Sequence, residues 1–279
     1  MNTLKLGFSP CPNDTFIFEA LLHHRFSFQY DVEAQLFDVE KLNRLALTSE
    51  MEISKLSFAA YASVSDKYQI LSSGAALGRN CGPLLISKNQ VDLSKAGELK
   101  VAIPGKYTTA NLLLSIFFPE VTNKTEVIFS GIEDEVLKGD FDLGLIIHES
   151  RFTYAKRGLK KVADLGEYWE ARFNKPIPLG CIAIRRDLPQ EVKESIQKGI
   201  ADSVKWAFEH PQDSRDYIQQ HAQELSSEVQ QKHIDLYVNQ FSIDLGTEGR
   251  EAINLLLSYG HQVNLLPKCV EPIFITEIK

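Results

Sequence analysis

His148 is the residue best placed to act as a base. It ends the run Asp142-Leu-Gly-Leu-Ile-Ile-His148, in which an apolar stretch typical of a parallel β-strand stops in four polar residues. Ligands of open α/β sheets bind at the carboxyl ends of strands, and an imidazole with an ordinary pKa of about 6.5 can accept a proton at neutral pH. The alternative is a structural histidine that hydrogen-bonds a loop. Glu149 and Arg151 can orient the ring, bind substrate or pair with each other, and the sequence does not choose.

Two threonines, Thr108 and Thr109, follow a strand-like segment and a Pro-Gly turn, where a helix over 110–117 begins. The unpaired amides and the positive dipole end of a helix form a natural carboxylate site. The alternative is N-capping, which needs only one of the two hydroxyls. Ser57 has the same place after strand 53–56, and Lys55 adds charge if it points into the cleft. We therefore expect two helix N-termini to face each other.

A third polar loop, Ser-Pro-Cys-Pro-Asn-Asp-Thr over 9–15, also lies between a strand and a helix. Its prolines restrict the backbone, and Asn13 or Asp14 can cap the helix or shape the floor of a cleft. A nucleophilic Cys11 is disfavoured because no partner histidine can be named. The remaining histidines have polar neighbours, so we expect them on the surface: His23, His24, His210, His221, His233 and His261.

The scaffold expected around these residues alternates strands with helices. Strands are predicted at 4–8, 32–37, 53–56, 69–71, 84–87, 100–103, 126–129, 143–147 and 181–185. Helices are predicted to start near Asp14, Val39, Ser57, Thr108, Ile132 and Gly166. This alternation is typical of βαβ units and mainly parallel sheets. After residue 186 the spacing indicates helices alone, at 189–209, 213–220, 227–241 and 247–259.

The chain is expected to form two domains. A glycine-rich segment at 74–82 precedes an apolar strand, a polar stretch follows, and a new βαβ series begins near residue 100. We predict a crossing near residue 90 and a return near residue 180. The larger α/β domain is then discontinuous, 1–90 plus 180–279, and the smaller comprises 91–179.

Composition excludes several classes of function. The 279 residues carry a formal net charge of −7 without a cluster of lysines and arginines, so nucleic acid is not expected as a partner. No stretch of 18 apolar residues predicts a membrane span, and the start of the chain lacks the pattern of a signal peptide. The four cysteines are scattered, which favours reduced thiols in the cytoplasm over a metal site. The sequence does not indicate an oligomeric state.

Five segments together resemble the 1,4-dihydroxy-6-naphthoate synthase family, which belongs to the futalosine route of menaquinone biosynthesis. They are Gly7-Phe-Ser-Pro-Cys-Pro-Asn-Asp-Thr-Phe, Lys55-Leu-Ser-Phe-Ala-Ala-Tyr, Gly78-Arg-Asn-Cys-Gly-Pro, Pro104-Gly-Lys-Tyr-Thr-Thr and Gly144-Leu-Ile-Ile-His-Glu-Ser-Arg-Phe-Thr-Tyr. The likeness extends to Tyr237-Val-Asn-Gln-Phe-Ser and is weaker in the last thirty residues.

The resemblance implies the two-domain, periplasmic-binding-protein-like (type II) α/β fold with a ligand cleft between the domains. It implies a lyase that converts cyclic dehypoxanthinyl futalosine into 1,4-dihydroxy-6-naphthoate and dihydroxyacetone, without a metal or organic cofactor. His148 corresponds to the proton acceptor of the family. The substrate-binding motifs correspond to Lys55, Leu56, Ser57, Thr108 and Thr109. We expect Asn13, Asp14 and Arg151 to shape the cleft.

Two other functions fit the same pattern. One is a cytosolic protein that binds or senses a small anion, since this fold is used mainly for binding. The other is the sister enzyme of the same pathway, chorismate dehydratase. Loss of His148 separates an enzyme from a binder, because a binder tolerates it, and the His-Glu-Ser-Arg and Ser-Pro-Cys-Pro-Asn-Asp motifs favour the naphthoate synthase.

Overall fold

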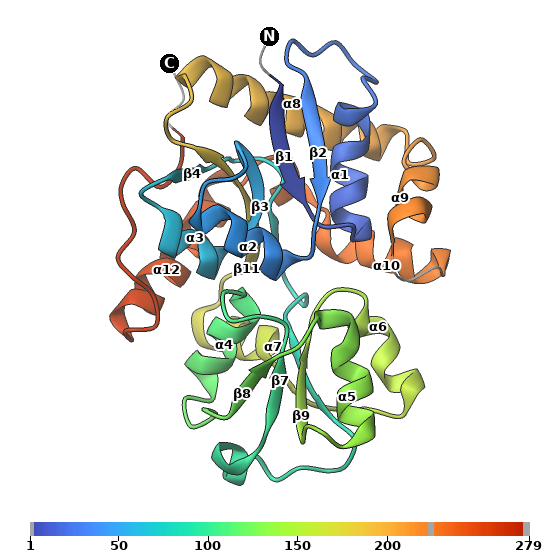
Figure 1. The fold of residues 1–279 in the computed structure, drawn as a ribbon, viewed down its shortest axis with the longest axis vertical. Helices are drawn as coiled ribbons and strands as arrows, with labels where there is room; N and C mark the ends of the chain where they lie inside the picture. Colours follow the sequence, from blue (N-terminus) through green and yellow to red (C-terminus); the bar gives the residue numbers. More distant parts are fainter. Residues whose placement is uncertain (1–2, 223–225, 276–279) are drawn as a thin grey trace.

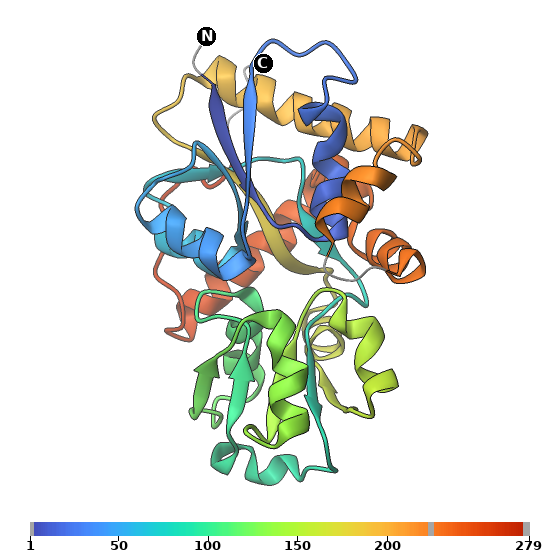
Figure 2. The same cartoon turned by 45° about the vertical axis from the view of Figure 1, so that its right-hand side comes forward.

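The computed structural model describes residues 3–222 and 226–275 and shows two lobes, each built on its own β-sheet (Figure 1). The large lobe holds a six-stranded sheet of order β2-β1-β3-β11-β4, with β5 also paired to β11. The small lobe holds a five-stranded sheet of order β10-β6-β9-β7-β8. Seen after a turn of 45°, the two lobes remain stacked, with the green small lobe below (Figure 2).

The sheet of the large lobe joins segments from both ends of the chain. Its strands are β1 (Leu4–Phe8), β2 (Val32–Leu36), β3 (Ile53–Ser57), β4 (Tyr68–Ile70), β5 (Ala76–Gly78) and β11 (Ile177–Arg185). Strand β1 is parallel to β2 and β3, whereas β11 is antiparallel to β3, β4 and β5. The sheet is therefore mixed, and the expectation of mainly parallel pairing was wrong because β11 returns from the other lobe in the opposite direction.

The sheet of the small lobe is also mixed. Its strands are β6 (Leu84–Ser87), β7 (Val101–Ile103), β8 (Lys124–Glu126), β9 (Leu143–Ile146) and β10 (Lys160–Asp164). Strand β7 is parallel to β8 and β9, and β6 is antiparallel to β9 and β10. The strand predicted at 126–129 was misplaced: β8 ends at Glu126, and Phe129–Gly131 forms a 3-10 turn.

Strand pairing places the first crossing between the lobes earlier than residue 90. Strand β6 was assigned to the larger domain, but it pairs with β9 and β10 of the small lobe, so the chain has crossed by residue 84. The return falls just before β11 begins at Ile177. The glycine-rich segment, of which β5 forms part, thus leads directly into the crossing.

Helices cover both faces of the large sheet. They are α1 (Pro12–Leu22), α2 (Val39–Leu47), α3 (Phe58–Val64), α8 (Gln190–Glu209), α9 (Arg215–His221), α10 (Ser227–Tyr237), α11 (Gln240–Ile243) and α12 (Gly246–Gln262). As the spacing predicted, α8 buries one stripe, Ile196, Ile200 and Val204, each 0% exposed. That stripe fixes the helical C-terminal part of the chain onto the core formed by the first strands.

The small lobe contains α4 (Thr109–Phe117), α5 (Ile132–Lys138), α6 (Ser150–Thr153) and α7 (Leu165–Phe173), with 3-10 segments at Leu93–Glu98, Phe129–Gly131 and Tyr154–Arg157. Strands β1, β3, β7 and β9 all end at the junction of the lobes, where their C-terminal loops meet (Figure 1). None of the helices in the described part of the chain has the length and apolarity needed to cross a bilayer.

Candidate active site

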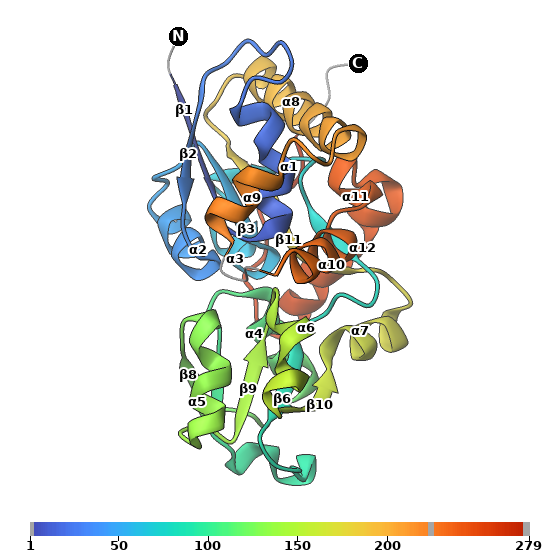
Figure 3. The ribbon, with the colours of Figure 1, turned by 90° about the vertical axis from the view of Figure 1, so that its right-hand side faces the viewer.

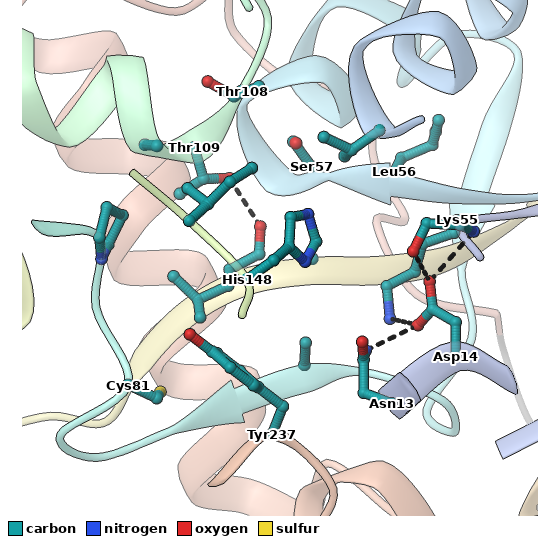
Figure 4. Close-up of a pocket in the computed structure, with 18 of the residues that line it drawn as sticks. Asn13, Asp14, Lys55, Leu56, Ser57, Cys81, Thr108, Thr109, His148 and Tyr237 are labelled. Carbon is teal, nitrogen blue, oxygen red and sulfur yellow. Dashed lines mark hydrogen bonds and ion pairs between the residues drawn. The ribbon is translucent and has the colours of Figure 1, made fainter. Parts of the chain in front are cut away.

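A cavity of about 90 Å³ lies between the lobes and is lined by residues of both. Sites for small molecules usually enclose roughly 300–1,000 Å³, so the space between the lobes in this structure is small for a metabolite. The lining includes eight of the nine residues that the sequence singled out: Asn13, Asp14, Lys55, Leu56, Ser57, Thr108, Thr109 and His148 (Figure 4). The ends of four strands, β1, β3, β7 and β9, thus meet at one place.

His148 lies two residues beyond the end of β9, with a left-handed backbone (φ 56°) that is uncommon for a residue with a side chain. Its ring packs against Phe129, with 5.0 Å between the ring centres. Burial lowers the pKa of His148 from 6.5 to about 4; Asp14 opposes this shift and Lys55 adds to it. The imidazole is therefore neutral at physiological pH and can accept a proton.

Helix α4 presents its N-terminus to the cavity. The Thr108 hydroxyl caps the helix by accepting a hydrogen bond from Asn111 N (3.2 Å), so capping accounts for this side chain. Thr109 does something different: its hydroxyl donates to Leu179 O (2.7 Å) and accepts from Ala59 N (3.3 Å). Since Ala59 belongs to the first turn of α3, the N-termini of α3 and α4 do face each other across the junction, as expected.

The end of β3 supplies Lys55, Leu56 and Ser57. Leu56 is fully buried, and Ser57 exchanges two hydrogen bonds with Asn43, from Asn43 Nδ2 to its hydroxyl (3.2 Å) and from its own amide to Asn43 Oδ1 (3.0 Å). Lys55 Nζ lies 2.9 Å from Asp14 Oδ1 and donates to Gly74 O (3.2 Å). The positive charge of Lys55 is thus compensated inside the protein.

Asn13 and Asp14 shape the floor of the cavity from the first turn of α1. The Asp14 carboxylate accepts hydrogen bonds from the amide and hydroxyl of Ser9 (3.2 and 2.9 Å) and from Asn13 Nδ2 (2.8 Å). The dashed lines of Figure 4 trace this network as far as Lys55. Both side chains are buried, and their hydrogen bonds fix them in single orientations.

Arg151 lies outside the lining of the cavity. Its guanidinium donates to Gly82 O (2.6 Å) and to Asp164 Oδ2 (2.6 Å). It therefore ties α6 to the segment where the chain crosses between the lobes, and any influence on the cleft is indirect. Cys11 is buried, and burial together with the nearby Glu149 carboxylate raises the pKa of its thiol well above the usual range, which disfavours a nucleophilic thiolate.

The lobes are held together beside the cavity by a second set of contacts. Glu40 of α2 accepts a hydrogen bond from Tyr107 N of the small lobe (3.1 Å), and Arg44 pairs with Glu126 of β8 (2.7 Å). Gly105 (φ 155°) allows this approach, because a Cβ there would lie 2.4 Å from Glu40 Oε2. Burial raises the pKa of Glu40 to about 7.

Sequence reasoning missed His233. Its polar neighbours Gln231 and Lys232 suggested a surface residue, but it is 0% exposed and lines the cavity. A helical signal was present in the sequence: Val229, His233 and Tyr237 are spaced four apart and form the buried face of α10. The cavity therefore contains two imidazoles, one from each lobe.

Two lobes that enclose a cavity at the ends of their strands define a class of protein. The structure matches the alkanesulfonate-binding protein SsuA from Xanthomonas axonopodis with a TM-score of 0.73 over 96% of this chain and 95% of that one, at 13% identity. A zinc-bound ligand-binding component of an ABC-type import system from Staphylococcus aureus matches with a TM-score of 0.71 over 99% and 97%, at 15% identity. The chain thus has the two-lobed α/β fold of the periplasmic binding proteins.

Closer similarity identifies the family. Residues 4–262 match the family model described as menaquinone biosynthesis, and the chain belongs to that family. It is 45% identical to the 1,4-dihydroxy-6-naphtoate synthase of Thermus thermophilus over 99% of this chain and all of that one, and 39% identical to the Streptomyces coelicolor protein of the same name over 95% of each. Protein AF1704 from Archaeoglobus fulgidus matches in structure with a TM-score of 0.90 over 95% of this chain and 98% of that one, at 35% identity.

Proposed function

We propose that this chain is a 1,4-dihydroxy-6-naphthoate synthase, a lyase that cleaves cyclic dehypoxanthinyl futalosine into 1,4-dihydroxy-6-naphthoate and dihydroxyacetone. The two near-full-length relatives bear this enzyme's name. Within the molecule, the observation that carries the proposal is the position of the His148 imidazole, just beyond the end of β9 and in the cavity between two lobes. A receptor that only binds has no need of a base at this place.

The proposed reaction breaks one carbon–carbon bond while an aromatic ring forms. The atoms of the substrate divide between the two products with no net oxidation, so the protein has to accept a proton and to keep water away. His148 takes the proton, since its imidazole lies in the cavity and is neutral at physiological pH. Lobes that close further over the bound substrate would exclude water, which protects the intermediate and strengthens the electrostatic interactions around it.

The carboxylate of the substrate is proposed to bind at the start of α4. The amides of Thr109 and Ala110 have no hydrogen-bond partner within 3–222 and 226–275, and Ala110 also lines the cavity. Free amides at the positive end of a nine-residue helix suit an anion. Because Asp14 compensates Lys55, these amides are the better anchor for the charge.

Entry of the substrate requires the lobes to separate. We propose that they are two domains, with the smaller starting near residue 84, and that they hinge at the two crossings, residues 79–83 and 174–176. The small volume of the cavity supports this motion. We also propose that the protein works in the cytoplasm, since all four cysteines are free, as in proteins from reducing compartments.

The experiment that tests the proposal is incubation of the purified protein with cyclic dehypoxanthinyl futalosine, following dihydroxynaphthoate by absorbance and mass. We expect product with the wild-type protein and at least about a 100-fold lower kcat with His148→Asn, since general bases contribute about 10²–10⁴-fold. Binding without product would indicate a sensor of the same fold. Neither binding nor product, with turnover of chorismate, would indicate the sister dehydratase.

A further inference from the structure

The base in the cavity is paired with a second imidazole that belongs to the other lobe. His148 follows β9 of the small lobe, whereas His233 lies on α10 of the large lobe. Their rings are almost parallel, with an interplanar angle of 7° and 6.0 Å between the ring centres. Figures 1 and 3 both show α10 of the large lobe and α6 of the small lobe on opposite sides of the junction. The two rings can therefore face each other only while the cleft is closed.

A chain of directed hydrogen bonds fixes the orientation of His233. Asn13 Nδ2 donates to Asp14, so the other amide atom, Asn13 Oδ1, faces His233 Nε2 at 2.9 Å. A carbonyl oxygen only accepts, which means that Nε2 carries the hydrogen. His233 Nδ1 then holds the lone pair; it is buried without a hydrogen-bond partner among the residues described and lies 3.9 Å from Glu149 Oε2. The ring plane is thus set from the large lobe.

His148 has no comparable anchor. The described part of the chain forms no hydrogen bond to either nitrogen of its ring, although polar atoms of Cys11 and Glu149 lie within 4.8 Å, so the imidazole is oriented mainly by packing. Phe129 contacts it from its own lobe at 5.0 Å, and His233 supplies the parallel ring from the other lobe. A catalytic histidine is usually oriented by a hydrogen bond to a carboxylate or a carbonyl. Here the ring of His233, from across the cleft, contacts His148 instead.

We propose that His233 is the positioning residue of the base: closure of the lobes brings its ring, held by Asn13 and Asp14, against His148 and so sets the imidazole for proton transfer. His148 is correctly oriented only after the substrate has been enclosed. A neutral ring face beside it also favours the positive charge that His148 gains in the transition state. The inference deepens the proposed function and rests on it for its kinetic test.

Three substitutions of His233 separate the ring from its hydrogen bond. His233→Phe keeps the parallel ring and loses both nitrogens, His233→Gln can still donate to Asn13 but loses the ring, and His233→Ala loses both. We expect the Gln and Ala variants to lose about 100-fold in kcat, the scale for a misplaced reacting group, and the Phe variant to stay within about tenfold of the wild type. Lys232→Ala, exposed on the same helix, is the matched control and should not change kcat.

A second readout does not depend on turnover. With 2-naphthoate bound, the titration of His148 by NMR should have its midpoint near pH 4 in the wild type and in His233→Phe, and nearer 6.5 in His233→Ala, where water reaches the ring. The charged or titratable groups around His148 are the same in all variants: Cys11, Asp14, Asp38, Lys55 and Glu149. A role in stability alone would lower the melting temperature and leave this midpoint in place.

Two results would overturn the inference: a folded His233→Ala variant with wild-type kcat and titration, or a Phe variant as inactive as Ala and Gln. If His233→Ala does not fold, His233→Gln takes its place, because it can keep the hydrogen bond to Asn13 and loses only the ring; wild-type kcat in a folded Gln variant would then reject the inference. Absence of turnover by the wild type refutes the proposed function instead, and the NMR titration still decides whether His233 acts on His148.

Discussion

The pKa of His148 makes a quantitative prediction about acidification. In the closed cleft the pKa is about 4, instead of 6.5 for a hydrated imidazole. At pH 5.5 a base with a pKa of 4 is still about 97% neutral, whereas a base with a pKa of 6.5 is only about 9% neutral. If His148 takes the proton in the enclosed complex, kcat at pH 5.5 should be nearly the same as at pH 7.5. If the ring were hydrated instead, kcat should fall roughly tenfold between pH 7.5 and pH 5.5.

The assay is initial-rate kinetics at saturating substrate from pH 4 to 8, with far-UV circular dichroism at each pH to confirm that the protein stays folded. kcat reports the complex and kcat/KM the free enzyme, so the two profiles should separate. We expect kcat to halve near pH 4 and kcat/KM to halve closer to pH 6.5, because the cleft is open to water before substrate binds. A kcat that halves near pH 6.5 would show that the base is hydrated during the reaction, or that it is another residue.

Three further predictions concern the walls of the cavity. Replacing Thr108 and Thr109 together by Ala should raise KM roughly tenfold with a smaller effect on kcat, because the helix cap and the bonds to Leu179 and Ala59 that hold the two amides in place are lost; unchanged binding of 2-naphthoate in calorimetry would show that the hydroxyls do not position the carboxylate site. Asp14→Asn or Lys55→Met alone should lower the free energy of unfolding by about 3–5 kcal/mol, because each leaves one partner of a buried ion pair uncompensated. The double variant should lose clearly less than the sum of the two single losses. Additive losses in urea unfolding would show that the two residues are not coupled. The pKa of Glu40 is raised from 4.5 to about 7, so the folded state holds the Glu40 proton more tightly than the unfolded state. The contribution of Glu40 to the free energy of unfolding therefore falls as pH rises from 4.5 to 7 and is constant above pH 7. Glu40→Gln should remove this pH dependence of stability, and the same dependence in both proteins would contradict the prediction.

Much of the architecture follows from local patterns in the sequence. Strands such as β1 and β9 are apolar runs that end abruptly in polar loops, and α8 carries one clear apolar stripe. From those features we predicted two lobes and placed His148, Thr109 and Ser57 at the cleft between them. The ends of these strands can be recognised because consecutive residues change from apolar to polar, even where the polar residues are themselves buried.

What could not be predicted depends on tertiary pairing. Strand β6 looks the same whether it pairs with one sheet or the other, so the crossing was placed too late. The antiparallel direction of β11 depends on how the chain returns from the small lobe, and no residue pattern within β11 indicates it. His233 was hidden because its neighbours in sequence are polar, while its partners Asn13 and His148 come from 220 residues away and from the other lobe.

The discontinuous large lobe has a consequence for the order of folding. All strands of the small sheet lie between residues 84 and 164, so that sheet can be completed from one contiguous stretch of chain. The large sheet cannot, because β3 has to wait for β11 at 177–185. During synthesis the N-terminal strands are exposed until the small lobe has been made, and contacts so distant in sequence form slowly. The topology therefore predicts that the small lobe folds first and that its collapse brings the two parts of the larger lobe together.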